Sequence, residues 1–234
     1  MTTPLSTAPG GGLYGALVER SGLGAAAQFM LEEVPDGARV LDVGCASGYL
    51  GARLTPRGCR VVGFERDRAS AVEARAHCES VIVGDIETDE DRRQIEGPFD
   101  VVLLGDVLEH LVDPWGALRF VRTLLGESGI AVASIPNVAA WPVRFALLRG
   151  SFEYADVGLM DRTHLRWFTH ASARRLVYEA GFEIERERFS PIEQPPGVMR
   201  RAAPLATDLA VKAALRLWPG LMAQQFVLRL RPRA

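Results

Sequence analysis

Hydrophobic and polar positions change period repeatedly along the chain, and the change predicts strands separated by helices. Short apolar runs rich in β-branched residues alternate with segments in which apolar residues recur at helical spacing. The predicted strands are 38–43, 60–64, 80–83, 100–104, 130–135, 182–188 and 225–230, and the predicted helices are 14–20, 25–34, 50–57, 69–76, 117–125, 171–180 and 204–217. This order predicts parallel β-α-β units in a doubly wound α/β fold.

Three segments follow from this pattern. Residues 1–37 are expected to form a helical cap over a cofactor site, residues 38–190 a core, and residues 191–234 a helix and a last strand that complete the same domain. Between 141 and 169 the rhythm is broken by aromatic and charged residues and two glycines. We expect the stretch from about 139 to 169 to be an inserted, irregular substrate segment.

Length, charge and cysteine content narrow the class of protein. With 234 residues, 48% of them hydrophobic, the chain is long enough for one full core. A net charge of −2 gives no bulk attraction to polyphosphate, so a nucleic-acid partner is not expected. The three cysteines suit a reducing, cytoplasmic location without structural disulfides. Neither a secretory signal nor a transmembrane span is expected.

The most informative stretch is the sequence VLDVGCASG at residues 40–48, an apolar strand that runs directly into a glycine-rich turn. Gly44, Gly48 and the small Ala46 allow the backbone to approach a ligand closely. Asp42 stands where a carboxylate can accept a hydrogen bond from that ligand. The stretch therefore predicts a nucleotide-cofactor loop.

Polar or glycine positions also follow the next three predicted strands. Glu65 ends the second strand, where an acidic side chain can bind the hydroxyl groups of a ribose. The third strand is followed by the GDI turn at 84–86, and the fourth by the sequence GDVLEHLVDP at 105–114. Ligands of open α/β sheets bind at this carboxyl edge. A solvated acid at position 65 and a simple polar turn at 84–86 are the structural alternatives.

Over residues 38–181 these motifs resemble those of the class I S-adenosylmethionine-dependent methyltransferases. The motifs are LDVGCASG at 41–48, Glu65, GDI at 84–86, DVLEHL at 106–111 and the LLGESG turn at 124–129. The resemblance implies a Rossmann-like, seven-stranded, mostly parallel sheet whose antiparallel last strand is 225–230.

The resemblance also implies the cofactor, S-adenosylmethionine, with S-adenosylhomocysteine as product. Asp42 and the backbone of 44–48 would hold the methionine part, Glu65 the ribose, and Asp85 with Ile86 the adenine. The full set of expected cofactor residues is Asp42, Gly44, Cys45, Ala46, Gly48, Glu65, Arg66, Asp85, Ile86, Asp106 and Val107. The chain departs from the family pattern in two places. Ala46 replaces a glycine, with the smallest possible side chain, and Glu127-Ser128 replaces Pro-Gly in a turn.

Methyl transfer to a hydroxyl requires alignment, exclusion of water and removal of a proton. The segment 158–169 resembles one found in methyltransferases associated with sugars or glycoconjugates, with quinone-type O-methyltransferases as relatives. It implies that Asp161, Arg162 and His164 face the acceptor, with Asp161 orienting the imidazole or a hydroxyl and His164 taking the proton. Alternatively, Asp161 and Arg162 pair to fix a loop and His164 is structural. His110 is a further catalytic candidate, although it can equally line the cofactor pocket.

The sequence gives weaker signals for a metal site and for the residues that bind the acceptor. No set of histidines and carboxylates has convincing ligand spacing, since Asp161 and His164 make only a pair, so we predict no metal. Aromatic and cationic side chains suit a ring-shaped or anionic acceptor, with core packing as the alternative. The expected substrate-binding residues are Arg162, Trp141, Arg144, Tyr154 and Trp167.

The last part of the chain is basic and carries an apolar helix face and Trp218. Its basic residues are Arg200, Arg201, Lys212, Arg216, Arg229, Arg231 and Arg233. Peripheral contact with an anionic membrane is one interpretation. The favoured one is a helix that covers the sheet or makes a dimer contact, so a monomer or a homodimer is expected.

The leading hypothesis is therefore transfer of a methyl group to a hydroxyl of a small-molecule acceptor, such as a sugar or glycolipid in a biosynthetic pathway. N-methylation of an amine would use the same donor site. An NAD-dependent oxidoreductase shares the glycine turn and the ribose acid, but position 46 breaks the G-x-G-x-x-G spacing. A non-catalytic adenosine-binding protein is the alternative from another class. The acceptor, the methylated atom and the oligomeric state do not follow from the sequence.

Overall fold

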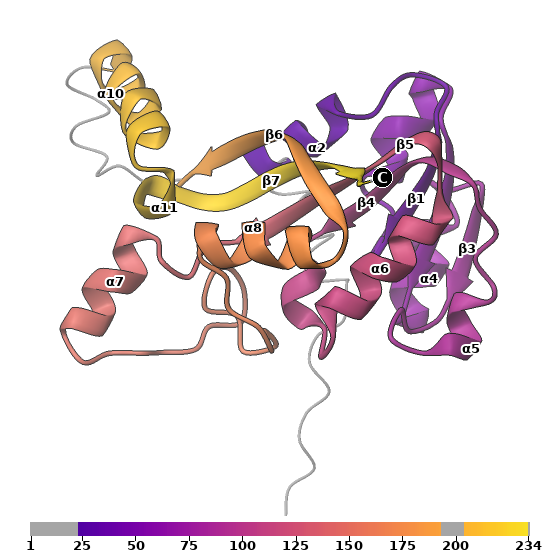
Figure 1. Cartoon of the computed structure of the whole chain (residues 1–234), viewed down its shortest axis with the longest axis horizontal. Helices are drawn as coiled ribbons and strands as arrows, with labels where there is room; N and C mark the ends of the chain where they lie inside the picture. The colour runs from indigo at the N-terminus through magenta and orange to yellow at the C-terminus, as the bar shows by residue number, and fades with distance from the viewer. Residues whose placement is uncertain (1–22, 193–203, 234) are drawn as a thin grey trace, which may run out of the picture.

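A seven-stranded sheet in the order β3-β2-β1-β4-β5-β7-β6 forms the centre of the computed structural model, which describes residues 23–192 and 204–233 (Figure 1). The strands are β1 (Arg39–Val43), β2 (Arg60–Glu65), β3 (Ser80–Val83), β4 (Phe99–Gly105), β5 (Leu125–Pro136), β6 (Phe182–Pro191) and β7 (Ala223–Pro232). Strands β1 to β5 pair in parallel, and β7 runs antiparallel between β5 and β6. The predicted doubly wound sheet with an antiparallel last strand is confirmed.

The helices agree with the sequence pattern except at a few places. They are α2 (Ala25–Glu32), α3 (Gly51–Leu54), α4 (Arg68–Ala74), α5 (Asp89–Arg92), α6 (Pro114–Leu124), α7 (Trp141–Leu148), α8 (His170–Glu179), α10 (Pro204–Leu217) and α11 (Pro219–Met222), with 3₁₀ turns η1 (Thr55–Arg57) and η2 (Leu108–His110). The predicted helix 14–20 lies outside the described residues.

Four predictions at this level were wrong in detail. The helix expected at 50–57 is α3 followed by η1, because Pro56 has no backbone N–H to continue the α-helical ladder. The helix expected at 117–125 starts earlier, where the Asp113 side chain accepts a hydrogen bond from the N–H of Gly116. The turn expected at 124–129 is part of β5. The segment expected to be irregular contains α7, which has a proline in its first turn.

Helices cover both faces of the sheet, with α2 on one side and α6 and α8 on the other (Figure 1). Strand residues alternate between the two faces. Leu41 and Leu104 belong to the apolar cluster that includes α6 and α8, whereas Val40 and Leu103 belong to the cluster that includes Met30 of α2. The central strands are therefore buried on both sides, which explains their nearly continuous apolar sequence.

A buried carboxylate fastens α2 to the carboxyl-terminal strands. Glu33, which follows α2, is 4% exposed. Its oxygens lie 3.1 Å from Arg186 Nη1, 3.3 Å from Arg188 Nε and 3.1 Å from Arg229 Nη1. Three guanidinium groups offset the cost of burying this charge. They hold α2 over β6 and β7, where it forms one wall of the cavity described below.

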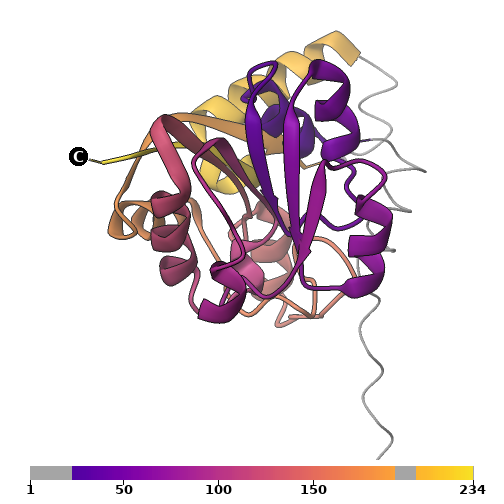
Figure 2. The ribbon, with the colours of Figure 1, turned by 90° about the vertical axis from the view of Figure 1, so that its right-hand side faces the viewer.

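The basic carboxyl-terminal part is partly neutralised by ion pairs. Arg229 and Arg231 both pair with Glu185, while Arg200 and Arg201 lie outside the described residues. At the end of α10, Trp218 is 61% exposed. Figure 2 looks onto the amino-terminal half of the sheet, with α10 in yellow beyond its upper end. Within the described part of the chain, no helix is both long and apolar enough to cross a membrane. Membrane contact by this part stays a prediction.

Insertion of β7 between β5 and β6 makes Phe226 a test of the fold. Its ring is fully buried in the cluster beneath α8. We expect Phe226→Ala to lower the free energy of unfolding by about 3 to 5 kcal/mol, because it removes buried contacts and leaves a cavity. Urea denaturation measures this loss. The matched control Val72→Ala, at a side chain that is 61% exposed, should change it by less than about 0.5 kcal/mol. Equal effects would contradict the assigned core.

Candidate active site

Acidic residues predicted from the sequence meet at one edge of the sheet. Asp42 lies in β1, Glu65 ends β2, Asp85 follows β3 and Asp106 follows β4. These four strands are neighbours and parallel. Because the carboxyl ends of parallel strands share an edge, the sequence places the four acids on the same side of the molecule.

The turn after β1 is held in a left-handed backbone conformation. The φ angles are 68° at Gly44, 48° at Ala46 and 80° at Gly48. A Cβ atom at position 44 would lie 2.7 Å from Cγ2 of Val107, and one at position 48 would lie 2.9 Å from Cα of Ala74. Glycine is therefore required at both positions. Ala46 adopts the same region at a cost of about 1 kcal/mol, so the departure noted in the sequence is a strained residue.

Glu65 holds this turn in place. Its carboxylate accepts a hydrogen bond from the N–H of Ala46 at 2.9 Å and another from the N–H of Asp67 at 2.7 Å. The same side chain that was predicted to bind a ribose thus also fixes the strained loop. The neighbouring Arg66, another predicted cofactor residue, is exposed, and Cys45 is buried.

Asp42 is buried without a full set of partners. It is 2% exposed, and its Oδ2 atom has no hydrogen-bond partner among the described residues. Burial, with a smaller contribution from the charge of Glu65, raises the pKa of Asp42 from 3.8 to about 7. A buried carboxyl group with an unpaired oxygen beside a glycine turn fits a site that receives a polar or cationic group of a ligand.

Asp106 connects the cofactor edge with the last strand. It has a φ angle of 54°, and its N–H donates to Ser134 Oγ at 3.0 Å. Its Oδ1 atom accepts from Ser134 Oγ at 2.6 Å and from Gln225 Nε2 at 2.7 Å. Sequence reasoning missed Ser134 and Gln225, because only the pairing of β5 with β4 and with β7 brings them to this edge.

The turn predicted to bind adenine is fixed by its own hydrogen bonds. The N–H of Asp85 donates to Asp91 Oδ2 at 2.8 Å, and Asp85 Oδ1 accepts from the N–H of Glu87 at 2.9 Å. Ile86 is 4% exposed and packs in the core. Contact of this turn with adenine stays a prediction.

A cavity of about 400 Å³ opens beside the glycine turn. Its walls come from α2, the turn after β1, the ends of β4 and β5, the start of β7 and the segment 157–164. Among the predicted site residues it brings together Gly44, Ala46, Asp106, His110, Asp161 and His164. Such a cavity can hold both the reactive end of a cofactor and a small acceptor.

The predicted substrate residues Trp141, Arg144, Arg162, Tyr154 and Trp167 are not among the residues that line this cavity. Arg144 donates to the carbonyl oxygen of Ala139, and Trp141 is 41% exposed on α7. Trp167 packs edge to face against His164, with 5.3 Å between ring centroids, and against Phe152. It therefore lies behind the cavity wall and supports it.

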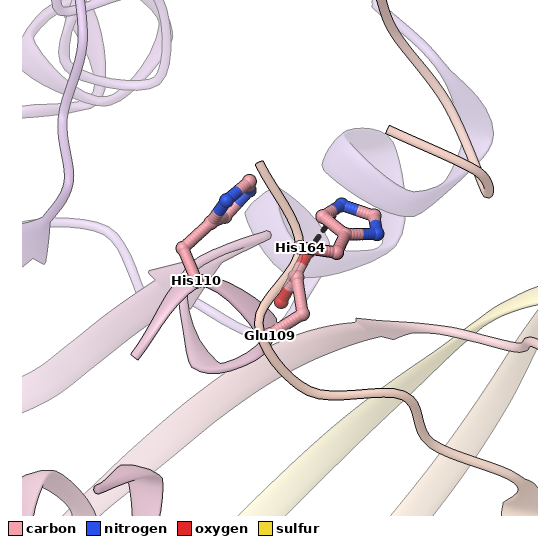
Figure 3. A group of neighbouring side chains, drawn as sticks. All are labelled: Glu109, His110 and His164. Atoms are coloured by element: carbon pink, nitrogen blue, oxygen red, sulfur yellow. Dashed lines mark ion pairs between the residues drawn. The ribbon is translucent and has the colours of Figure 1, made fainter. Parts of the chain in front are cut away.

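Glu109, His110 and His164 form a side-chain cluster at the cavity (Figure 3). His164 Nε2 lies 3.9 Å from Glu109 Oε1, and the two imidazole rings are 4.8 Å apart. Burial raises the pKa of Glu109 well above its usual value, and burial followed by the proximity of His110 lowers the pKa of His164. Both shifts favour the neutral forms.

This arrangement corrects two expectations about the segment 158–169. The carboxylate nearest the His164 imidazole is that of Glu109, whereas Asp161 Oδ1 accepts hydrogen bonds from the N–H and the hydroxyl of Thr163, at 2.8 and 2.7 Å. Arg162 does not pair with Asp161, because its guanidinium lies 2.6 Å from Asp156. The argument against a metal site was that ligand spacing is lacking along the sequence. It no longer holds, since the fold brings the distant His164 to the adjacent pair Glu109 and His110.

Comparisons with known proteins identify the family of this chain. The family model described as "Methyltransferase domain" matches residues 19–187. The ubiquinone biosynthesis O-methyltransferase of Acinetobacter baylyi is 30% identical over 154 residues, which are 64% of this chain and 65% of that protein. The chain thus spans slightly less than two thirds of the length of this relative.

Solved structures show the same fold at low identity. The putative methyltransferase in a complex with the Haloferax volcanii Trm112 methyltransferase activator has a TM-score of 0.65 and 18% identity, over 95% of both chains. Magnesium protoporphyrin IX methyltransferase from Synechocystis, solved with bound SAH, has a TM-score of 0.59 and 16% identity, over 94% of this chain and 84% of that one.

The raised pKa of Asp42 predicts a dependence of stability on pH. The folded protein keeps the proton up to about pH 7, whereas the unfolded chain releases it near 3.8. The free energy of unfolding should therefore fall as the pH rises from about 4 to 7, by at most about 4 kcal/mol from this group. Asp42→Asn removes this contribution, so the variant should gain stability relative to wild type as the pH rises.

Urea denaturation at a series of pH values, without ligand, measures this difference. Glu90→Gln, at an exposed position on α5, serves as the control and should follow the wild-type curve. If the Asp42→Asn curve also runs parallel to wild type, Asp42 is ionised in the folded protein.

Proposed function

This chain belongs to the class I S-adenosylmethionine-dependent methyltransferases, and from this premise we propose that it transfers the donor methyl group to a hydroxyl of a small-molecule acceptor. The observation that carries the proposal is the single cavity shared by the glycine turn and by His110, Asp161 and His164. The donor loop and the groups able to handle a proton thus face the same space.

The residues of the turn fit the donor. Gly44 and Ala46 line the cavity and support close approach of the ligand to the backbone, and the unpaired Oδ2 atom of Asp42 supports binding of its methionine part. Glu65, already fixed by two backbone N–H groups, is proposed to accept hydrogen bonds from the ribose. When bound, S-adenosylmethionine supplies a methyl carbon made electrophilic by its sulfonium group. Asp85 and Ile86 keep their proposed place at the adenine.

The acceptor side supports O-methylation. A hydroxyl oxygen must be positioned by the cavity wall and must lose its proton as the new bond forms. We assign removal of this proton to the cluster around His164, whose buried imidazole has an Nδ1 atom without a partner among the described residues. Asp161, on the same wall, is proposed to orient the hydroxyl.

The class of acceptor is inferred from the relatives and the cavity. Similarity to O-methyltransferases of ubiquinone biosynthesis favours a hydroxyl on a ring that carries apolar groups over a sugar or glycolipid. The cavity wall agrees, because Met30 and Leu159 give apolar surface beside the polar cluster. Proposed binding by Trp141, Arg144, Arg162 and Tyr154 requires an acceptor that extends beyond the cavity, whereas Trp167 acts through its packing against His164.

Donor binding is tested by isothermal titration with S-adenosylmethionine, S-adenosylhomocysteine and NAD. We expect both sulfur ligands to bind and NAD not to bind. Glu65→Ala should weaken binding of both by about 10- to 100-fold, because it removes a charged hydrogen-bonding group. Glu90→Gln, on the exposed face of α5, should bind as wild type does. Binding of NAD alone would refute the proposed function.

Methyl transfer is tested with a panel of phenols, sugars and amines and labelled donor. We expect a phenolic hydroxyl to be methylated. His164→Ala should lower turnover by about 100-fold or more, since it removes a group that promotes proton loss, while donor binding stays near wild type. His77→Ala, at an exposed histidine outside the cavity, is the matched control. Unchanged turnover in His164→Ala would exclude this role, and methylation of amines alone would favour an N-methyltransferase.

A further inference from the structure

We propose that Glu109, His110 and His164 form a binding site for a divalent transition-metal cation, such as Zn²⁺ or Co²⁺, at the acceptor end of the cavity. One oxygen or nitrogen atom from each of the three residues lies within 4.8 Å of the others. His110 and His164 line the cavity, and so does Glu109 (Figure 3).

The carboxylate of Glu109 needs a partner that the described protein atoms do not provide. Glu109 is 1% exposed, and both of its carboxylate oxygens lack a hydrogen-bond partner among the described residues. The imidazole of His164 is too far away for a direct bond, at 3.9 Å from Nε2 to Oε1. A buried carboxyl group without hydrogen bonds is costly, and a cation would satisfy it.

Each of the two imidazoles has a ring nitrogen that is available to bind a metal ion. His110 Nδ1 lies 3.2 Å from the carbonyl oxygen of Thr163. Donation of the Nδ1 proton to this carbonyl leaves Nε2 unprotonated, the arrangement that metal-ligating histidines show in proteins. His164 Nδ1 has no partner among the described residues, although the residue is only 9% exposed.

Backbone contacts fix the relative positions of the three side chains. The carbonyl oxygen of Glu109 accepts hydrogen bonds from the N–H of Leu165 at 2.8 Å and of Arg166 at 2.9 Å. These bonds fasten η2 to the irregular segment that carries His164. A cluster held by the main chain needs only side-chain rotation to close on an ion.

The required closure is small. Zinc bound by nitrogen and oxygen at about 2.0 to 2.2 Å in tetrahedral geometry places its ligand atoms roughly 3.4 Å apart. The present separations of up to 4.8 Å therefore need a shift of about 1 Å. Two nitrogens and one carboxylate favour zinc and its transition-metal neighbours over magnesium or calcium.

Three protein ligands leave a coordination position open toward the cavity. Its use rests on the proposed function: an acceptor hydroxyl oxygen that binds there has a lowered pKa and loses its proton to water before methylation. In this state His164 is a ligand and promotes proton loss through the cation instead of accepting the proton itself. Asp161, on the same wall, adds a negative charge that favours cation binding.

The test measures metal binding without donor or acceptor, on the full chain after removal of any affinity tag. Titration with Co²⁺, followed by visible absorption, should show one ion per chain with nitrogen and oxygen ligands. Glu109→Gln and His164→Gln should each weaken binding at least tenfold. His77→Gln should bind as wild type does, because this exposed histidine lies outside the cluster. Thermal melting of each variant shows that it is folded.

Each outcome separates the two proposals. Absent Co²⁺ binding, equal binding by all variants, or a thiolate charge-transfer band indicating Cys78 as ligand overturns the metal site. Full methyl transfer by protein treated with a chelator also overturns it, while the proposed function stands. Cation binding that depends on Glu109 and His164, together with no methylation of any acceptor, supports the site and contradicts the function.

Discussion

Parallel pairing of β1 with β2 and β4 is the constraint on which the rest of the structure depends. It aligns Asp42 in β1 opposite Gly63 and Leu103, and so brings the turns that follow all three strands to one edge. The glycine turn, the end of β2 and the end of β4 then share a space. Glu65 fixes two of those turns relative to each other, because its carboxylate accepts one hydrogen bond from the N–H of Ala46 and one from the N–H of Asp67.

The second constraint is the cost of burying charge, and it separates structural from functional residues. Glu33 is buried with three arginines around it, and it serves to hold α2 on the sheet. Asp42 and Glu109 are equally buried, yet their carboxylates keep unpaired oxygens, and both raised pKa values follow from burial. The contrast points to ligands as the missing partners. The two acids lie at the donor and acceptor ends of the proposed site.

The last strand joins these two ends. Because β7 enters between β5 and β6, it buries Phe226 in the core and delivers Gln225 to Asp106. The bridge from Asn137 to Phe168 lies beyond the end of β5 and anchors the segment that continues to α8. The segment that contains the cavity wall from 157 to 164 is thus held at both of its ends, at Asn137 and at Phe168. Residues from distant parts of the chain converge there without any shared sequence pattern.

The sequence by itself determined the fold class and the donor loop. Period-two and helical patterns predict five of seven strands to within two residues at each end, and the left-handed turn at Gly44 and Gly48 needs residues that local sequence reveals. The helix α7 was not predicted, because a proline such as Pro142 is typical of irregular structure. Proline is in fact well suited to the first turn of a helix. The cluster of Glu109 with His164 was decided only by tertiary structure. Backbone hydrogen bonds join two segments that are more than fifty residues apart, and the spacing of residues along the chain does not indicate such bonds.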